Sequence, residues 1–191
     1  MPFKQPPLYL EEWWFIKTAY ENGRIYLGEK SVTWDPNSET VLAKHELEYK
    51  KVKGKSIYVK FKVEGKHNEY LLIWSTTPWT IAYNLGIMAN PNLDYVKAST
   101  GKETWILAKG LLKEVEKITN TNLKVIETFK GKKLKGLRYE HPFYNELKHI
   151  YSAIIRESKN AFTVVLSKQY VDLSAGTGLV HMAPGCGPED A

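Results

Sequence analysis

Residues 56–63 read Ser-Ile-Tyr-Val-Lys-Phe-Lys-Val, and this alternation indicates the fold class of the chain. Apolar side chains occupy every second position, at Ile57, Val59, Phe61 and Val63. Successive side chains of a strand point to opposite faces, so these four share one face, opposite Tyr58 and the lysines. The pattern predicts a half-buried β-strand.

Further strands are predicted on both sides of this one, separated by turn residues such as Glu64-Gly65-Lys66 and Asn90-Pro91-Asn92. They cover residues 69–74, 95–98, 104–107, 123–128, 150–156, 162–166 and 179–182. Helices are predicted only over 8–22, where Gly23 follows a broad apolar stripe, and over 109–118. Many short strands and few helices favour a mainly β protein, a closed β-barrel with a few peripheral α-helices.

The bulk composition indicates a soluble globular protein. The 191 residues suit one domain spanning 1–191, and no apolar run approaches the roughly 20 residues that cross a bilayer. The N-terminus does not resemble a signal peptide, and the single cysteine excludes an internal disulfide. We therefore expect a cytoplasmic protein without a membrane partner.

Lysines dominate the charge of the chain, which is +6 with a pI of about 9.1. Two clusters lie at predicted turns: Lys50, Lys51, Lys53 and Lys55, and then Lys130, Lys132, Lys133, Lys135 and Arg138. They are either solvated turn lysines or a surface that steers a polyanion such as RNA. The sequence leaves both interpretations open.

The last predicted strand leads into a loop that suits a small ligand. His181 lies near its end, a loop rich in Pro and Gly follows, and Asp190 comes nine residues after the histidine. Such an arrangement would suit a small cationic ligand, although a rim histidine and solvated carboxylates are the simpler interpretation. Because the chain stops one residue after Asp190, we expect it to be excised from a longer protein.

Other chemistries are weaker alternatives. Cys186 lies five residues after His181, so a Cys–His nucleophile pair is conceivable, but no residue that would orient the base is evident. The five histidines and one cysteine show no metal-ligand spacing. We therefore expect no metal site.

A hydroxyl-rich segment follows the predicted strand 69–74. It reads Trp74-Ser75-Thr76-Thr77-Pro78-Trp79-Thr80, with Asn84 shortly after. A straight strand would divide consecutive hydroxyls between two faces, whereas a bend at Pro78 would bring them together to hold a water or a ribose hydroxyl. Alternatively, Thr77 is the N-cap of a helical turn that begins at Pro78.

Taken together, these segments resemble the editing insertion of isoleucyl-tRNA synthetases. The resemblance rests on residues 74–80 with Asn84, on Gly176-Thr177-Gly178-Leu179-Val180-His181-Met182-Ala183-Pro184 with Asp190, and on Val32-Thr33-Trp34-Asp35-Pro36. It continues through Glu48-Tyr49-Lys50, residues 56–61 and Gly136-Leu137-Arg138-Tyr139. The related valyl and leucyl enzymes carry Thr-x-Arg-Pro where this chain has Thr76-Thr77-Pro78-Trp79.

The resemblance implies a β-barrel that hydrolyses valine mischarged onto isoleucine tRNA. A pocket for isoleucine cannot strongly reject the smaller valine, so a second, smaller pocket removes it. By resemblance, Asp190 holds the substrate ammonium and is catalytic together with Thr76 and Thr77. The substrate-binding residues implied are Trp74, Ser75, Thr80, Asn84 and His181, of which His181 limits side-chain size.

The resemblance also implies partners and cofactors. The partners are the 3′ end of the isoleucine-accepting tRNA and valine, and we expect a monomer. Asp35 and Ser38 replace zinc-binding cysteines of many members, so no zinc is expected. No His-x-Gly-His or Lys-Met-Ser-Lys-Ser segment occurs, so we expect no cofactor here, whereas a parent isoleucine-tRNA ligase would use ATP and Mg. A non-catalytic RNA-binding β-barrel remains the alternative.

Overall fold

The computed structural model describes residues 8–29, 32–187 and 190, and the chain divides into two compact units, 1–31 and 32–191. The first unit contains α1 (Leu8–Glu21), which confirms the helix predicted over 8–22. Its aromatic side chains are largely exposed, including Trp13 and Trp14. All other elements belong to the second unit.

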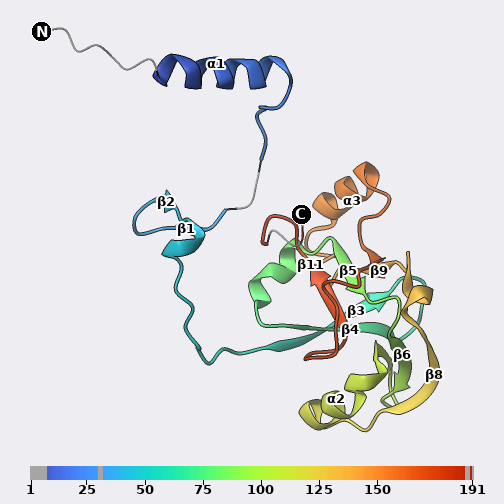
Figure 1. The fold of residues 1–191 in the computed structure, drawn as a ribbon. Coiled ribbons are helices and arrows are strands. Elements are labelled where there is room, and N and C mark those ends of the chain that lie inside the picture. The colour runs from blue at the N-terminus through green and yellow to red at the C-terminus, as the bar shows by residue number, and fades with distance from the viewer. Residues whose placement is uncertain (1–7, 30–31, 188–189, 191) are drawn as a thin grey trace, which may run out of the picture. The chain divides into compact units, whose positions relative to one another are not determined.

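A six-stranded sheet forms most of the second unit (Figure 1). Its strands are β3 (Ile57–Val63), β4 (Glu69–Ser75), β6 (Asp94–Ser99), β7 (Thr104–Ala108), β8 (Lys124–Lys130) and β9 (Tyr139–Glu140). Their order is β8-β6-β7-β4-β3-β9, with β4 and β7 parallel and the other pairs antiparallel. The first five of these strands were predicted from the sequence.

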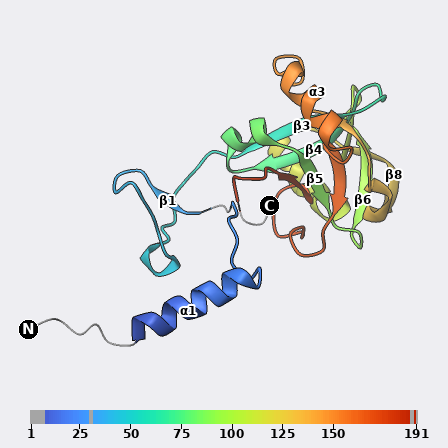
Figure 2. The same ribbon diagram turned by 90° about the horizontal axis from the view of Figure 1, so that it is seen from above.

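A second sheet has three strands, in the order β10-β5-β11. The central strand β5 (Gly86–Ala89) runs parallel to β10 (Thr163–Leu166) and antiparallel to β11 (Leu179–Met182). Figure 2 shows β5 from above, and the pairing places it between β10 and β11. All four residues of β5 are buried, and the strand is paired on both edges.

The connections contain short helical and extended elements. They are the hairpin β1 (Trp34–Asp35) and β2 (Thr40–Val41), the 3-10 turns η1 (Lys44–Glu46), η2 (Pro78–Tyr83), η3 (Lys109–Leu111) and η4 (Gly131–Leu134), and the helices α2 (Leu112–Thr119) and α3 (Lys148–Glu157). The turn η3 followed by α2 confirms the helix predicted over 109–118. No described helix has the length and apolar character that a membrane crossing requires.

The predicted closed barrel is wrong, although the mainly β composition is confirmed. Among the described residues, β8 and β9 remain the two edges of the large sheet and do not pair with each other. The edge strand β9 has two residues and is joined to the second sheet by a single isolated bridge, Arg138 with Thr163. A barrel requires a continuous ring of strand pairing, whereas here two sheets share one core.

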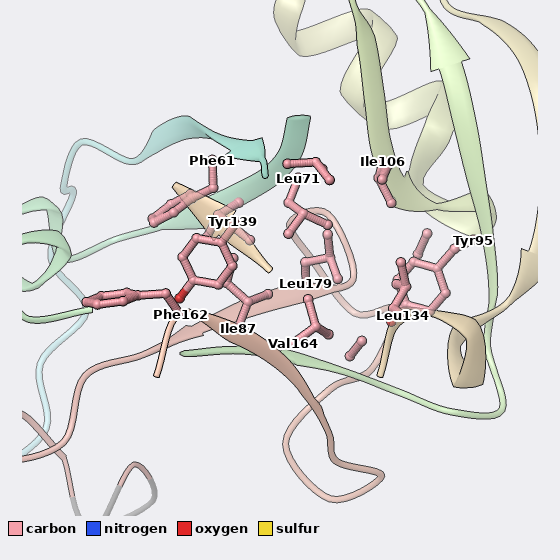
Figure 3. Packing of buried hydrophobic residues seen from close by; sticks show 14 of the residues in the cluster. Phe61, Leu71, Ile87, Tyr95, Ile106, Leu134, Tyr139, Phe162, Val164 and Leu179 are labelled. Atoms are coloured by element: carbon pink, nitrogen blue, oxygen red, sulfur yellow. The ribbon is translucent and has the colours of Figure 1, made fainter. Parts of the chain in front are cut away.

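The shared core explains why two separate sheets are stable (Figure 3). Phe61 and Leu71 from the large sheet pack in one cluster with Ile87, Val164 and Leu179 from the small sheet. All five are at most 2% exposed. A second cluster around Leu72, Val96 and Leu107 packs on the other face of the large sheet, with Val115 of α2. Apolar burial therefore joins the layers together with a few backbone hydrogen bonds, such as that from the Tyr139 N–H to the Phe162 carbonyl at 3.1 Å.

The short strands β1, β2 and β9 were not predicted, and two longer assignments also differ from the sequence prediction. Residues 150–156 were predicted as a strand, yet they lie in α3, where Tyr151, Ile154 and Ile155 follow helical spacing and pack on the core. The strand β5 was not predicted. It begins with Gly86, a poor strand former, where an added Cβ would lie 2.7 Å from Met182 Cε.

Candidate functional site

The hydroxyls of Ser75, Thr77 and Thr80 gather where β4 ends, and we refer to these three as the hydroxyl cluster. Ser75 is the last residue of the strand, and its Oγ lies 3.4 Å from Thr77 Oγ1 and accepts the Thr77 backbone N–H at 3.1 Å. Thr77 Oγ1 lies in turn 3.3 Å from Thr80 Oγ1. Ser75 and Thr77 are two positions apart and would share a face even of a straight strand, and the turn at Pro78 adds Thr80 to them. Thr76, which the bent alternative grouped with Ser75 and Thr77, is not brought in.

The position of Thr77 at the start of η2 agrees with the capping alternative, but its side chain does not act as a cap. Thr77 is the N-cap residue and Pro78 follows in the first turn, yet no side-chain cap hydrogen bond forms. The hydroxyl of Thr77 is instead within reach of Ser75 and Thr80. The Thr77 hydroxyl therefore belongs to the hydroxyl cluster and does not cap the turn.

Thr80 connects the hydroxyl cluster to His181. Its Oγ1 donates to the Thr77 carbonyl at 2.8 Å and lies 3.0 Å from His181 Nε2. A hydroxyl has one hydrogen to donate. Since that hydrogen is directed to the carbonyl, Thr80 must accept from His181, which places a hydrogen on Nε2 and fixes the ring in one tautomer.

His181 is held in its neutral form by burial. Removal from water lowers the pKa of His181, and the negative charge of Asp190 opposes this shift. With the hydrogen on Nε2, Nδ1 carries a lone pair. It is buried and makes no hydrogen bond within the part of the chain that the structure describes. The ring therefore has an unused acceptor within the described part of the chain, and it interacts electrostatically with the Asp190 carboxylate.

The strand β5 explains how residues 101 positions apart come together. It follows η2 after two residues, so one end of β5 lies beside Thr80. The antiparallel strand β11 pairs Met182 with Gly86 and His181 with Ile87, and the Leu85 N–H donates to the Met182 carbonyl at 2.9 Å. This register places His181 beside the turn that carries Thr80.

The predicted residues Trp74 and Thr76 lie at the margin of the site. Trp74 is half-buried, and its indole lies against Gly176, where an added Cβ would be 2.9 Å from the ring. Gly176 has φ +82°, so both its backbone conformation and this close approach favour glycine. Thr76 is exposed, and its hydroxyl makes no hydrogen bond with a described residue. The side chains of Trp74 and Thr76 are therefore near the hydroxyl cluster without belonging to it.

Asn84, a predicted substrate-binding residue, lies behind the site. Its side chain is fully buried, Nδ2 donates to the Gly86 carbonyl at 2.8 Å, and Oδ1 accepts from the Tyr139 hydroxyl. Burial raises the pKa of Tyr139, so this phenol stays protonated and donates. Both ends of the Asn84 amide are thus engaged, and in this structure the residue supports the junction of η2 and β5.

Two further residues support η2 and were not predicted. His141 is buried among aromatic rings, accepts the Phe143 N–H on Nδ1 at 3.0 Å, and therefore donates from Nε2 to the Ile81 carbonyl at 2.9 Å. Burial lowers the pKa of His141. The Tyr151 hydroxyl donates to the Ala82 carbonyl at 3.1 Å. Nothing in the local sequence indicates these contacts, since 60 and 69 residues separate the partners.

The alternative chemistries find little geometric support. Cys186 is exposed, and the ring of His181 is bonded to Thr80 instead. Among the residues that the structure describes, no group of three or more His, Cys, Asp or Glu side chains is placed to hold a metal ion. The described residues therefore bring hydroxyls, the imidazole of His181 and the carboxylate of Asp190 to the site.

Comparison with known proteins places this site in a family context. Residues 6–171 match the family described as "tRNA synthetases class I (I, L, M and V)". The chain is 47% identical over 189 residues to the isoleucine–tRNA ligase of Pyrococcus furiosus, covering 95% of this chain and 18% of that protein. It is 43% identical over 189 residues to that of Methanocaldococcus jannaschii, covering 93% and 18%. The chain thus spans about a fifth of the length of these relatives.

Solved structures share the fold at low sequence identity. The crystal structure of GlLeuRS-CP1 has a TM-score of 0.56 and 16% identity, covering 71% of this chain and 57% of that one. The P. knowlesi cytosolic leucyl-tRNA synthetase editing domain has a TM-score of 0.50 and 13% identity, covering 71% and 60%. Since the family match covers most of the sequence, the chain belongs to the class I tRNA synthetases of the isoleucine, leucine, methionine and valine group.

Proposed function

We propose that this chain is an aminoacyl-tRNA editing hydrolase that removes valine mischarged onto isoleucine tRNA. The observation that carries the proposal is the hydrogen-bonded group of Ser75, Thr77 and Thr80 hydroxyls, joined to His181 next to Asp190. Two comparisons support it. The relatives are isoleucine–tRNA ligases, and a solved structure with this fold is an editing domain.

The substrate and the site are chemically complementary. The substrate is an ester between an amino acid with a free ammonium and the terminal ribose of tRNA. Asp190 supplies a carboxylate for the ammonium, a charge-assisted contact. The hydroxyls of Thr76 and Thr77 position a water, whose oxygen attacks the ester carbonyl while the bond to the ribose oxygen breaks. The water proton passes to the leaving ribose oxygen, which becomes the hydroxyl of uncharged tRNA, and free valine is released.

His181 and Thr80 set the size limit in this proposal. The imidazole is held by the Thr80 hydroxyl at 3.0 Å, and Thr80 is held by its own turn at 2.8 Å. A wall fixed by two hydrogen bonds does not easily move aside for an additional methylene. Binding alone distinguishes two substrates that differ by one methylene only weakly, by about 10- to 200-fold. A rigid wall excludes the larger side chain more strongly than a movable wall, and so increases the difference between valine and isoleucine.

The remaining properties follow from the same proposal. The hydrolysis needs no cofactor in this proposal, and ATP and Mg would serve a parent ligase; the chain spans 18% of the length of the Pyrococcus furiosus ligase. We propose that the protein acts in the cytoplasm as a monomer. Trp74 and Ser75 are proposed to contact the adenosine end of the substrate, since both lie at the end of β4, next to the other residues of the hydroxyl cluster.

Deacylation of two charged tRNAs tests the proposal. Isoleucine tRNA carrying valine or isoleucine is incubated with the 191-residue chain, and release of labelled amino acid is measured after subtracting uncatalysed hydrolysis. We expect faster loss of valine. Equal loss of both amino acids would contradict the size limit, and no loss above background would favour the alternative of a non-catalytic RNA-binding module.

Replacing Thr80 tests the wall directly. Thr80→Val keeps the shape but removes the hydroxyl that accepts from His181, and a hydrogen bond of this kind contributes about 0.5–1.5 kcal/mol. We expect the ratio of valine to isoleucine deacylation to fall by about 2- to 10-fold. Thr80→Ser, which retains the hydroxyl, should keep the ratio, and a loss of equal size in both variants would refute this role.

A further inference from the structure

The basic residues of the second unit differ in whether their charges are already paired. Among the described residues, Lys130 pairs with Asp94 at 2.8 Å, Lys133 with Glu127 at 3.9 Å, and Arg138 with Glu64 at 2.9 Å. Other lysines of the large sheet are paired as well, as Lys60 is with Glu103 at 2.9 Å, although Lys124 is not. Three of the five residues of the second cluster are therefore paired with neighbours, whereas Lys132 and Lys135 form no ion pair with a described residue.

The first cluster is not neutralised. Lys50, Lys51, Lys53 and Lys55 are all exposed, and none forms an ion pair with another residue in the described part of the chain. We refer to residues 50–55 as the lysine run. It has no helix or strand, and the neighbouring Tyr49 is 94% exposed. Four cations within six residues, with no internal partner, attract a polyanion.

The register of the large sheet places the lysine run beside the candidate site. The run leads through Ser56 into β3, whose first residue, Ile57, pairs with Ser75. Because the pair is antiparallel, the chain preceding β3 leaves the sheet at the end where the hydroxyl segment begins. Figures 1 and 2 show the green turn of residues 78–83 close to the point where β3 starts.

We infer that the lysine run binds the RNA backbone next to the nucleotide whose ester enters the site, an inference that rests on the proposed function. An extended run of six residues spans up to about 20 Å, enough for several phosphates. Lysines supply the charge, and the exposed ring of Tyr49 offers a surface on which an unpaired base can stack. The lysine run therefore binds the same RNA strand whose esterified end enters the site.

The test measures RNA binding, which requires no hydrolysis. Lys50, Lys51, Lys53 and Lys55 are replaced together by Gln in the 191-residue chain. The control replaces Lys113, Lys117, Lys124 and Lys132 by Gln, which removes the same charge from exposed lysines that make no ion pair with a described residue. Affinity for an uncharged isoleucine tRNA transcript is measured across a series of salt concentrations.

In the run variant, we expect the slope of log affinity against log salt concentration to become shallower by about 2 to 3, since each phosphate contact to a single strand contributes about 0.7. The control should keep most of the slope. Equal losses in both variants would show that total charge decides, and an unchanged slope in the run variant would also overturn the inference. If deacylation is absent but the run variant alone loses binding, the proposed hydrolysis fails and the binding surface stands.

Discussion

Replacing Asp190 with Asn is expected to lower kcat/KM for valyl-tRNA deacylation by about 30- to 150-fold, because a hydrogen bond to a charged group contributes about 2–3 kcal/mol. Asp190 acts electrostatically on His181, so its carboxylate is near the ring that we propose as the pocket wall. The amide of Asn keeps the size of the side chain and removes its charge. The substrate ammonium would then lose its counter-charge in the transition state as well as in the ground state.

Asp172→Asn is the matched control for this variant. Asp172 also belongs to the C-terminal part of the chain, but its carboxylate is hydrogen-bonded within its own loop, to the Ser174 N–H at 2.9 Å and to the Ser174 hydroxyl at 2.6 Å. We expect deacylation close to that of the unmodified chain. Equal rates for the two variants, measured with the same charged tRNA, would remove Asp190 from the proposed mechanism.

Replacing Asn84 with Ala is expected to lower the free energy of unfolding by about 3 kcal/mol, because buried polar groups lose their partners. The Gly86 carbonyl would lose the Asn84 donor, and the Tyr139 hydroxyl would lose the acceptor Oδ1. For a protein of this size, the midpoint of thermal unfolding should fall by about 6–12 °C. Calorimetry or circular dichroism measures this change directly.

Two further variants separate support from substrate contact. Asn145 is exposed, so Asn145→Ala should change stability by less than about 0.5 kcal/mol. Tyr139→Phe removes the hydroxyl that Asn84 accepts, so its effect combined with Asn84→Ala should be less than additive. If Asn84→Ala were as stable as Asn145→Ala yet lost deacylation, Asn84 would instead contact the substrate, as the family resemblance implies.

Much of the secondary structure was predictable because it depends on local patterns. The alternation over Ile57–Val63 and the helical stripe over Leu8–Glu21 are properties of neighbouring residues, and both elements form as predicted. The prediction failed over Lys148–Glu157, where strand-like apolar residues also fit helical spacing and the packing of Tyr151 against the core favours the helix. A short apolar run is ambiguous until its tertiary partners are known.

The mainly β class, the positions of the hydroxyl segment and of His181, and the excess of positive charge can all be read from the amino-acid sequence. The three-dimensional fold was needed to see that two sheets share a core instead of closing into a barrel, that His181 meets Thr80, and that Asn84 lies behind the site. It also decided which lysines are unpaired. The difference comes from separation along the sequence. Side-chain periodicity is set by adjacent residues, whereas these contacts depend on strand register and on burial among residues far apart in the chain.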